Sequence, residues 1–90
     1  MKFPFKEKQI GKQLFLREFS ANVDEMDLIW HEDREDRIVH VLEGNKWKFQ
    51  FDEQLPFEML DGIDIIIPKG IIHRIIRGKG PLKIRVYKDY

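Results

Sequence analysis

The sequence predicts an all-β fold, and three observations carry that prediction. Isoleucine, phenylalanine and valine dominate its apolar residues whereas Ala21 is the one alanine, and β-branched and aromatic side chains favour strands. Apolar and charged residues alternate with a period of two, most clearly over 46–52 and 82–87. Glycine, proline and asparagine mark turns at short intervals, so every strand between them must be short.

We expect eight strands, at about residues 13–19, 25–31, 37–42, 46–51, 57–60, 63–67, 72–77 and 82–87. The alternation predicts a buried face in two of them, made by Trp47, Phe49 and Phe51 and by Leu82, Ile84 and Val86. Residues 1–12 are rich in lysine and have no clear period, so they form either a mobile arm or an extra edge strand. Residues 13–90 form one domain, and strands of this spacing favour a sandwich or a closed barrel.

Composition excludes several classes of function. The 90 residues include 16 Lys and Arg against 16 Asp and Glu, so no net charge is available to hold a nucleic acid or an anionic membrane. Cysteine is absent and Ser20 is the single hydroxyl candidate outside the tyrosines, which leaves almost nothing for nucleophilic acyl transfer. No apolar run is long enough for a membrane span or a signal peptide, so we expect a cytoplasmic protein.

One segment carries a more specific pattern. Gly62, Pro68, Gly70 and His73 are separated by five, one and two residues, and four residues after the histidine comes Arg77. This spacing resembles the second sequence motif of the cupin family, in which an asparagine stands at the position of Arg77. The resemblance implies a double-stranded β-helix, which is a jelly-roll barrel.

An upstream segment resembles the first cupin motif in part. His31 and Gly44 match the first histidine and the final glycine of that motif, while Asp33 takes the place of its second histidine and Arg37 that of its glutamate. In cupins these positions and the histidine of the second motif converge on one divalent metal. The resemblance therefore implies His31, Asp33 and His73 as ligands of a divalent transition metal such as Fe, Mn, Ni or Zn, in a two-histidine, one-carboxylate set.

Arg37 opposes that metal. A guanidinium about 4 Å from a divalent ion costs roughly 8 kcal/mol at an effective dielectric constant of about 20. Two arrangements follow: Arg37 points away and leaves the metal site open, or it pairs with Asp33 and replaces the metal by a salt bridge.

The resulting prediction is a small single-domain cupin that binds a small polar or anionic metabolite in its barrel. The lining residues would be His31, Asp33, Arg37 and His73, joined by Arg77 because it has the same strand parity as His73. One alternative is a metal-dependent oxygenase or isomerase that uses His31, Asp33 and His73. A second alternative is a structural or regulatory homodimer without a ligand.

The apolar segments 28–30, 65–67, 71–72 and 75–76 place large side chains at both strand parities, so some must point away from the barrel. We therefore expect a two-fold homodimer with Trp30 or the isoleucine-rich strands in the contact.

Overall fold

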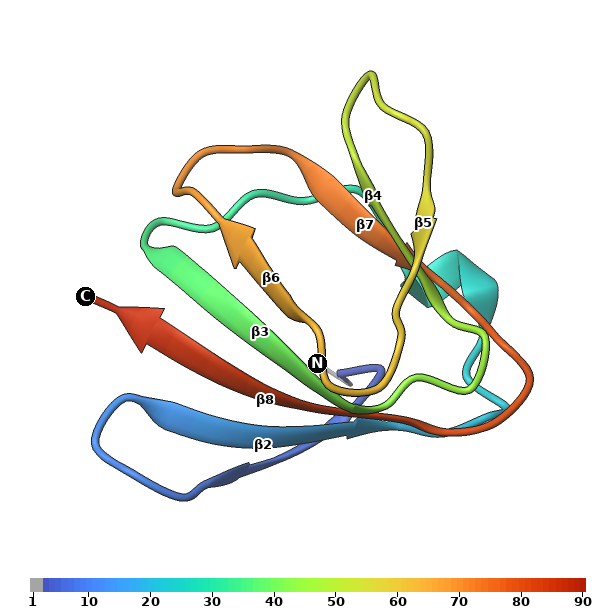
Figure 1. The fold of residues 1–90 in the computed structure, drawn as a ribbon, viewed down its shortest axis with the longest axis horizontal. Helices are drawn as coiled ribbons and strands as arrows, with labels where there is room; N and C mark the ends of the chain where they lie inside the picture. Colours follow the sequence, from blue (N-terminus) through green and yellow to red (C-terminus); the bar gives the residue numbers. More distant parts are fainter. Residues whose placement is uncertain (1–2) are drawn as a thin grey trace.

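The structure is a computed structural model that describes residues 3–90, and it consists of two antiparallel sheets that face each other across one apolar core (Figure 1). The larger sheet has the strand order β1-β2-β8-β3-β6, and the smaller one has the order β5-β4-β7. In chain order the strands are β1 (Lys6–Gln9), β2 (Leu14–Phe19), β3 (Asp36–Glu43), β4 (Lys48–Phe51), β5 (Phe57–Glu58), β6 (Asp64–Ile67), β7 (His73–Ile76) and β8 (Leu82–Asp89). The predicted all-β jelly-roll architecture is confirmed.

The core forms where the inward faces of the strands meet. In the larger sheet Val86 on β8 pairs with Phe15 on β2 and with Val39 on β3, and Val39 pairs in turn with Ile65 on β6. Because successive side chains of a strand alternate between its faces, this register places one row of apolar residues on the inner side. The buried apolar residues are Phe19, Val23, Val39, Val41, Trp47, Phe49, Met59, Ile65, Ile67, Leu82, Ile84 and Val86.

The strand expected at 25–31 does not form. Asp24 instead caps a single turn of 3-10 helix, Glu25–Asp27, by accepting a hydrogen bond from the backbone N–H of Met26 at 2.9 Å. An aspartate at an N-cap satisfies one of the free N–H groups of a helical turn, and this local bond takes precedence here over strand pairing. Only His31 of the expected strand pairs with a neighbour, through an isolated bridge to His73.

The N-terminal segment extends the larger sheet. Within the segment 1–12, residues Lys6–Gln9 form β1 and pair with β2 at the sheet's edge, while residues 1 and 2 lie outside the described residues. Phe5 precedes this strand and packs against the buried ring of Phe19, with 5.2 Å between the ring centroids.

Over residues 3–90, no helix has the length and apolar character needed to cross a membrane.

Candidate functional site

The candidate site lies where a pair of main-chain hydrogen bonds joins β7 of the smaller sheet to the segment that leads to β3. The N–H of His31 donates to the carbonyl of His73 at 3.0 Å, and the N–H of His73 donates back at 2.9 Å. Two residues further along, the N–H of Gly70 donates to the carbonyl of Asp33 at 2.9 Å. Gly70 has φ +77°, a left-handed conformation that glycine adopts without a steric penalty. The turn before β7 is therefore held against the segment before β3.

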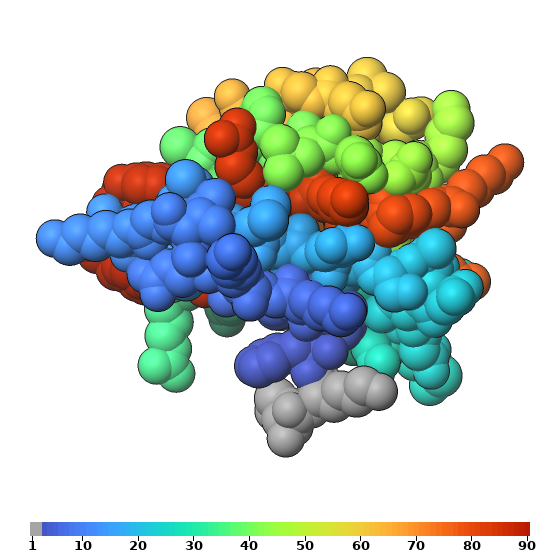
Figure 2. All heavy atoms as spheres, turned by 90° about the horizontal axis from the view of Figure 1, so that it is seen from below, coloured from blue at the N-terminus to red at the C-terminus, as the bar shows by residue number. Residues whose placement is uncertain are grey.

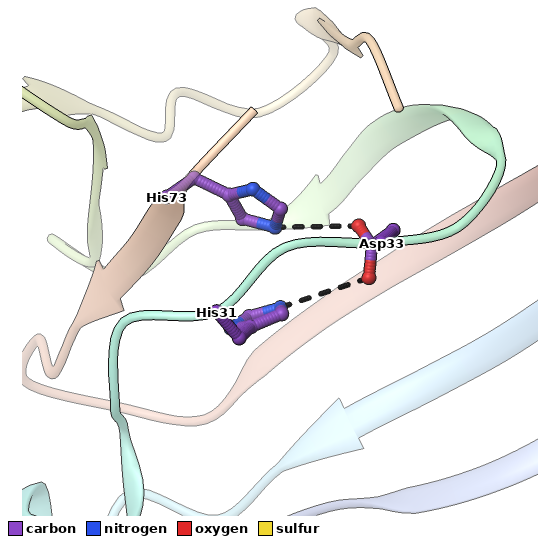
Figure 3. A group of neighbouring side chains, drawn as sticks. All are labelled: His31, Asp33 and His73. Carbon is purple, nitrogen blue, oxygen red and sulfur yellow. Dashed lines mark ion pairs between the residues drawn. The ribbon is translucent and has the colours of Figure 1, made fainter. Parts of the chain in front are cut away.

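This backbone arrangement brings three side chains together (Figure 3). The Nε2 atom of His73 lies 3.4 Å from Oδ2 of Asp33, and Nε2 of His31 lies 4.0 Å from Oδ1 of the same carboxylate. The two imidazole rings meet edge to face with 4.3 Å between their centroids. One ligand atom from each of the three residues lies within 4.8 Å of the others. The structure thus brings together His31, Asp33 and His73, the three residues that the sequence predicts to meet.

Both histidines present the same nitrogen to Asp33. Nδ1 of His73 lies 2.8 Å from the carbonyl oxygen of Ile71, and Nδ1 of His31 lies 3.2 Å from that of Ile29. A carbonyl oxygen only accepts, so Nδ1 of each ring carries the proton and Nε2 of a neutral ring has a free lone pair. Such lone pairs bind divalent transition metals.

The Asp33 carboxylate is buried and incompletely satisfied. Its side chain is 6% exposed, and Oδ2 has no hydrogen-bond partner among the described residues. Burial lowers the pKa of His73, an effect that nearby His31 and Arg37 strengthen and that the Ile71 carbonyl and Asp33 oppose. A neutral His73 leaves two acceptors, Nε2 and Oδ2, facing each other, and a cation between them would satisfy both.

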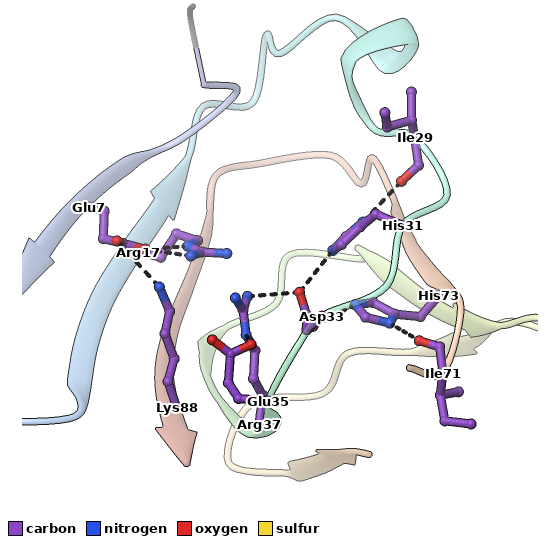
Figure 4. Close-up of polar contacts among 10 residues, drawn as sticks. All are labelled: Glu7, Arg17, Ile29, His31, Asp33, Glu35, Arg37, Ile71, His73 and Lys88. Atoms are coloured by element: carbon purple, nitrogen blue, oxygen red, sulfur yellow. Dashed lines mark hydrogen bonds and ion pairs between the residues drawn. The ribbon is translucent and has the colours of Figure 1, made fainter. Parts of the chain in front are cut away.

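Arg37 enters the site and does not point away from it (Figure 4). Its Nη1 atom lies 3.2 Å from Oδ1 of Asp33, and its Nε donates to Oε2 of Glu35 at 3.3 Å. The guanidinium therefore pairs with one oxygen of Asp33 and leaves the other on the side of His73. Of the two arrangements that the sequence left open for Arg37, the structure has the salt bridge to Asp33, and this bridge occupies only half of the carboxylate.

The three-residue group fits a divalent transition metal by its chemistry. Two neutral imidazole nitrogens and one carboxylate oxygen suit such an ion, and the three ligand atoms, which lie within 4.8 Å of one another, would have to move closer together to reach bonds of about 2.1 Å. The unsatisfied Oδ2 atom would be the ligand oxygen, and the pairing of Oδ1 with Arg37 orients the carboxylate. The positive charge of Arg37 weakens the attraction for the ion without removing a ligand.

A pocket of about 680 Å³ opens beside this group, and His31, Asp33 and Arg37 form part of its wall. Another part of the wall comes from the N-terminal segment through Phe3 and Phe5. Figure 2 shows the N-terminal segment in dark blue on one face of the molecule, next to the segment of residues 20–30 in cyan. The pocket lies between the edge of the larger sheet and the segment that leads to β3.

Comparisons with solved structures identify this architecture. The chain is 22% identical to a cupin-2 domain protein from Shewanella frigidimarina, with a TM-score of 0.66 over 96% of this chain and 79% of that one. It is 20% identical to a putative mannose-6-phosphate isomerase from Ralstonia eutropha, with a TM-score of 0.67 over 96% of this chain and 83% of that one. The chain has a cupin fold.

Other structures that share this fold are larger. FeII HppE superimposes with a TM-score of 0.67 at 14% identity over 84% of this chain and 41% of its own length. The chain thus spans about two fifths of HppE, and a similar share of the DMSP lyases that it resembles. The sequence matches no family profile and no curated protein.

The observed site differs from the predicted one in two residues. Arg77 does not join the cluster: its guanidinium donates to the carbonyl of Val23 at 2.9 Å and pairs with Glu25 at 3.0 Å. Strand parity does not place Arg77 correctly, because its long side chain reaches the 3-10 turn that forms in place of the expected strand. His73 contacts Asp33 but does not line the pocket, since it is 3% exposed and stacks on Phe49.

Among the lining residues that sequence reasoning missed are two cations. Arg17 on β2 and Lys88 on β8 both face the pocket and both pair with Glu7 on β1. A signal for Arg17 exists in the sequence, because it shares its strand parity with the inward-facing Phe15 and Phe19.

Proposed function

We propose that this cupin-fold protein binds a small polar or anionic metabolite in the pocket beside His31, Asp33 and Arg37. The observation that carries the proposal is the position of Arg37, whose largely buried guanidinium lines the pocket while one oxygen of Asp33 holds it in place. A guanidinium held in this way offers further N–H donors in a fixed plane, which suits carboxylate and phosphate groups.

A cytoplasmic location remains a prediction of the sequence.

A thermal-shift panel tests this function. Carboxylates, sugar acids and phosphates are added to the purified protein, and we expect at least one of them to raise the melting temperature. A ligand present at 100 times its Kd stabilises the fold by about 2.7 kcal/mol. Arg37→Ala should abolish the shift, whereas Arg85→Ala, which removes a charge from the outer face of β8, should preserve it. A panel without any shift, or an unchanged shift in Arg37→Ala, would contradict the proposal.

A metal-dependent enzyme, an oxygenase or an isomerase, is the second candidate. The observation that favours it is the unsatisfied Oδ2 atom of Asp33 opposite Nε2 of His73. His31, Asp33 and His73 would hold Fe, Mn, Ni or Zn, and the bound ion would supply Lewis-acid chemistry at its open positions. One of the solved structures that share the fold is FeII HppE, and others are DMSP lyases.

Elemental analysis separates the two candidates. Near-stoichiometric metal in the purified wild type that is lost in His73→Ala would favour the enzyme. Metal clearly below one equivalent is the result expected for a metabolite-binding protein.

A further inference from the structure

The pocket contains a second guanidinium with unused donors. Arg17 directs Nε and Nη2 to the carboxylate of Glu7, and its plane lies over the ring of Phe5 at 3.9 Å. Its Nη1 atom has no acceptor among residues 3–90, and neither does Nη2 of Arg37. Neither nitrogen is sealed from solvent, because Asp33 supplies the one buried unpaired side-chain atom in the described part of the chain. Each arginine thus keeps N–H donors that face open space.

The two guanidinium groups face the same space. Arg17 comes from β2 and Arg37 from β3, and Figure 4 shows their side chains converging on the region beside Asp33. Burial lowers the pKa of Arg17, Glu7 raises it, and the charge of Arg37 lowers it further, as expected for two neighbouring cations. Lys88 adds a third cation to this wall, with its Nζ atom 3.9 Å from Glu7.

Apart from its charged residues, the pocket has apolar walls. The charges of the lining balance, because the three cations are matched by three carboxylates, Glu7, Asp27 and Asp33. Most of the exposed lining is hydrocarbon, and it is provided by Phe3, Phe5, Phe19, Leu28, Ile29 and Ile75. A ligand that fills this space must therefore bring apolar surface as well as acceptors for the two arginines.

We propose that the pocket takes an organic monocarboxylate with an apolar body, and that its carboxylate lies between Arg17 and Arg37. The hydrocarbon part lies against the Phe5 ring and the side chains of Leu28 and Ile75. This inference rests on the proposed function and makes it specific, because it names the class of ligand and adds Arg17 as a binding residue. A planar carboxylate accepts one hydrogen bond from each guanidinium without breaking the pair between Arg17 and Glu7.

Three small probes test both parts of the inference by isothermal titration calorimetry. Phenylacetate carries the charge and the apolar body, acetate carries only the charge, and 2-phenylacetamide carries the body without the charge. We expect phenylacetate to bind at least about tenfold more tightly than either of the others, because each lacks one of the two contacts.

Variants of Arg17 locate the carboxylate. Arg17→Gln should weaken phenylacetate binding about tenfold or more. Arg17→Lys keeps the charge beside Glu7 but loses the planar fork, and it should weaken binding by a smaller factor, which keeps the test valid if Arg17→Gln does not fold. The matched control is Arg85→Gln on the outer face of the same sheet, which should bind as the wild type does.

The outcomes separate this inference from the proposed function. Equal affinities for acetate and phenylacetate would overturn the inference, and so would unchanged binding in both Arg17 variants. If Arg37→Ala still abolishes the binding of an anion in either case, the proposed function stands. A wild-type protein that binds no anion in the thermal-shift panel would overturn both.

Discussion

At the scale of single residues, the site depends on how one carboxylate divides its contacts. Asp33 offers one oxygen to Arg37 and the other to the side of His73, so a salt bridge and a metal ligand can coexist on the same group. The sequence presented these as alternatives, because it shows which residues meet but not which oxygen each of them contacts. Replacement of Arg37 is therefore the most direct test of whether the site binds a metal ion.

Arg37→Glu should raise the metal content of the purified protein. The change removes a positive charge beside the ligands and places a carboxylate at the position of the glutamate ligand in the cupin motif. The measurement is elemental analysis after expression in metal-supplemented medium, and we expect the wild type to stay clearly below one equivalent. Arg85→Glu makes the same change of charge on the outer face and should not gain metal. An equal gain in both variants would show that net charge, and not this position, controls uptake.

Gly44, the last residue of the first motif, has a steric role. A Cβ atom at this position would lie 1.7 Å from the carbonyl oxygen of Met59, which is backbone and cannot move aside cheaply. Gly62, the first residue of the second motif, has open space around its Cα but a φ of +88°. The two glycines are thus required for different physical reasons.

Gly44→Ala should lower the free energy of unfolding by about 2–3 kcal/mol, because the backbone around Met59 has to shift. Gly62→Ala should cost only about 1 kcal/mol, since it strains a single left-handed residue. Urea denaturation of both variants measures the difference. A larger loss in Gly62→Ala would contradict the steric account.

At the scale of elements, β1 is attached to the barrel by charge as well as by main-chain pairing. Glu7 lies opposite Arg17 in the β1–β2 register and also reaches Lys88 on β8. The Arg17 and Lys88 side chains are 12% and 15% exposed, so neither is well solvated without its partner. One carboxylate thus links three strands at the rim of the pocket.

Glu7→Gln should destabilise the fold by about 1–2 kcal/mol, between the values for an exposed pair and a buried one. The matched control is Glu58→Gln, which removes one member of the exposed Lys46–Glu58 pair and should change stability by less than about 0.5 kcal/mol. Equal effects in urea denaturation would mean that the Glu7 contacts behave as ordinary surface pairs.

Strand prediction from the sequence succeeded where side chains alternate. The expected inner faces of 46–51 and 82–87 are buried, with Phe51 half-buried. Alternation predicts the inner face correctly because side chains of a strand alternate between its two faces whichever strand it pairs with. The prediction failed at 25–31, where Asp24 and Glu25 stabilise a local turn that leaves no periodic signal in the sequence. Arg17 was missed because a cation at an inward position has meaning only once the pocket that it faces is known.

At the scale of the whole molecule, the outer face of the larger sheet carries an apolar row. The strand register aligns Leu14, Tyr87, Ile38 and Ile66 across β2, β8, β3 and β6, and Ile66 is 68% exposed. The adjacent row contains both Arg85 and Asp64, so two copies of this face can meet without net repulsion between like charges. We propose a two-fold homodimer through this surface of the isoleucine-rich strands. Trp30, the other contact expected from the sequence, lies under the guanidinium of Arg74 in the same chain.

Light scattering at high micromolar concentration should give the mass of a dimer. Ile66→Lys, which places a charge in the middle of the contact, should give the mass of a monomer. Leu55→Lys changes an exposed loop residue in the same way and should leave the dimer intact. A monomeric wild type, or a dimeric Ile66→Lys variant, would contradict this assembly.

The main-chain bridge between His31 and His73 has a consequence for the energy of binding. Because reciprocal hydrogen bonds of 3.0 and 2.9 Å hold the two backbones together, the separation of the main chains that carry the two imidazoles is set before any ligand arrives. A site preorganised in this way pays little conformational entropy when it is filled, so more of the contact energy appears as affinity. The bridge uses no side-chain atoms, and substitutions of either histidine can therefore remove an imidazole while the frame that held it stays closed.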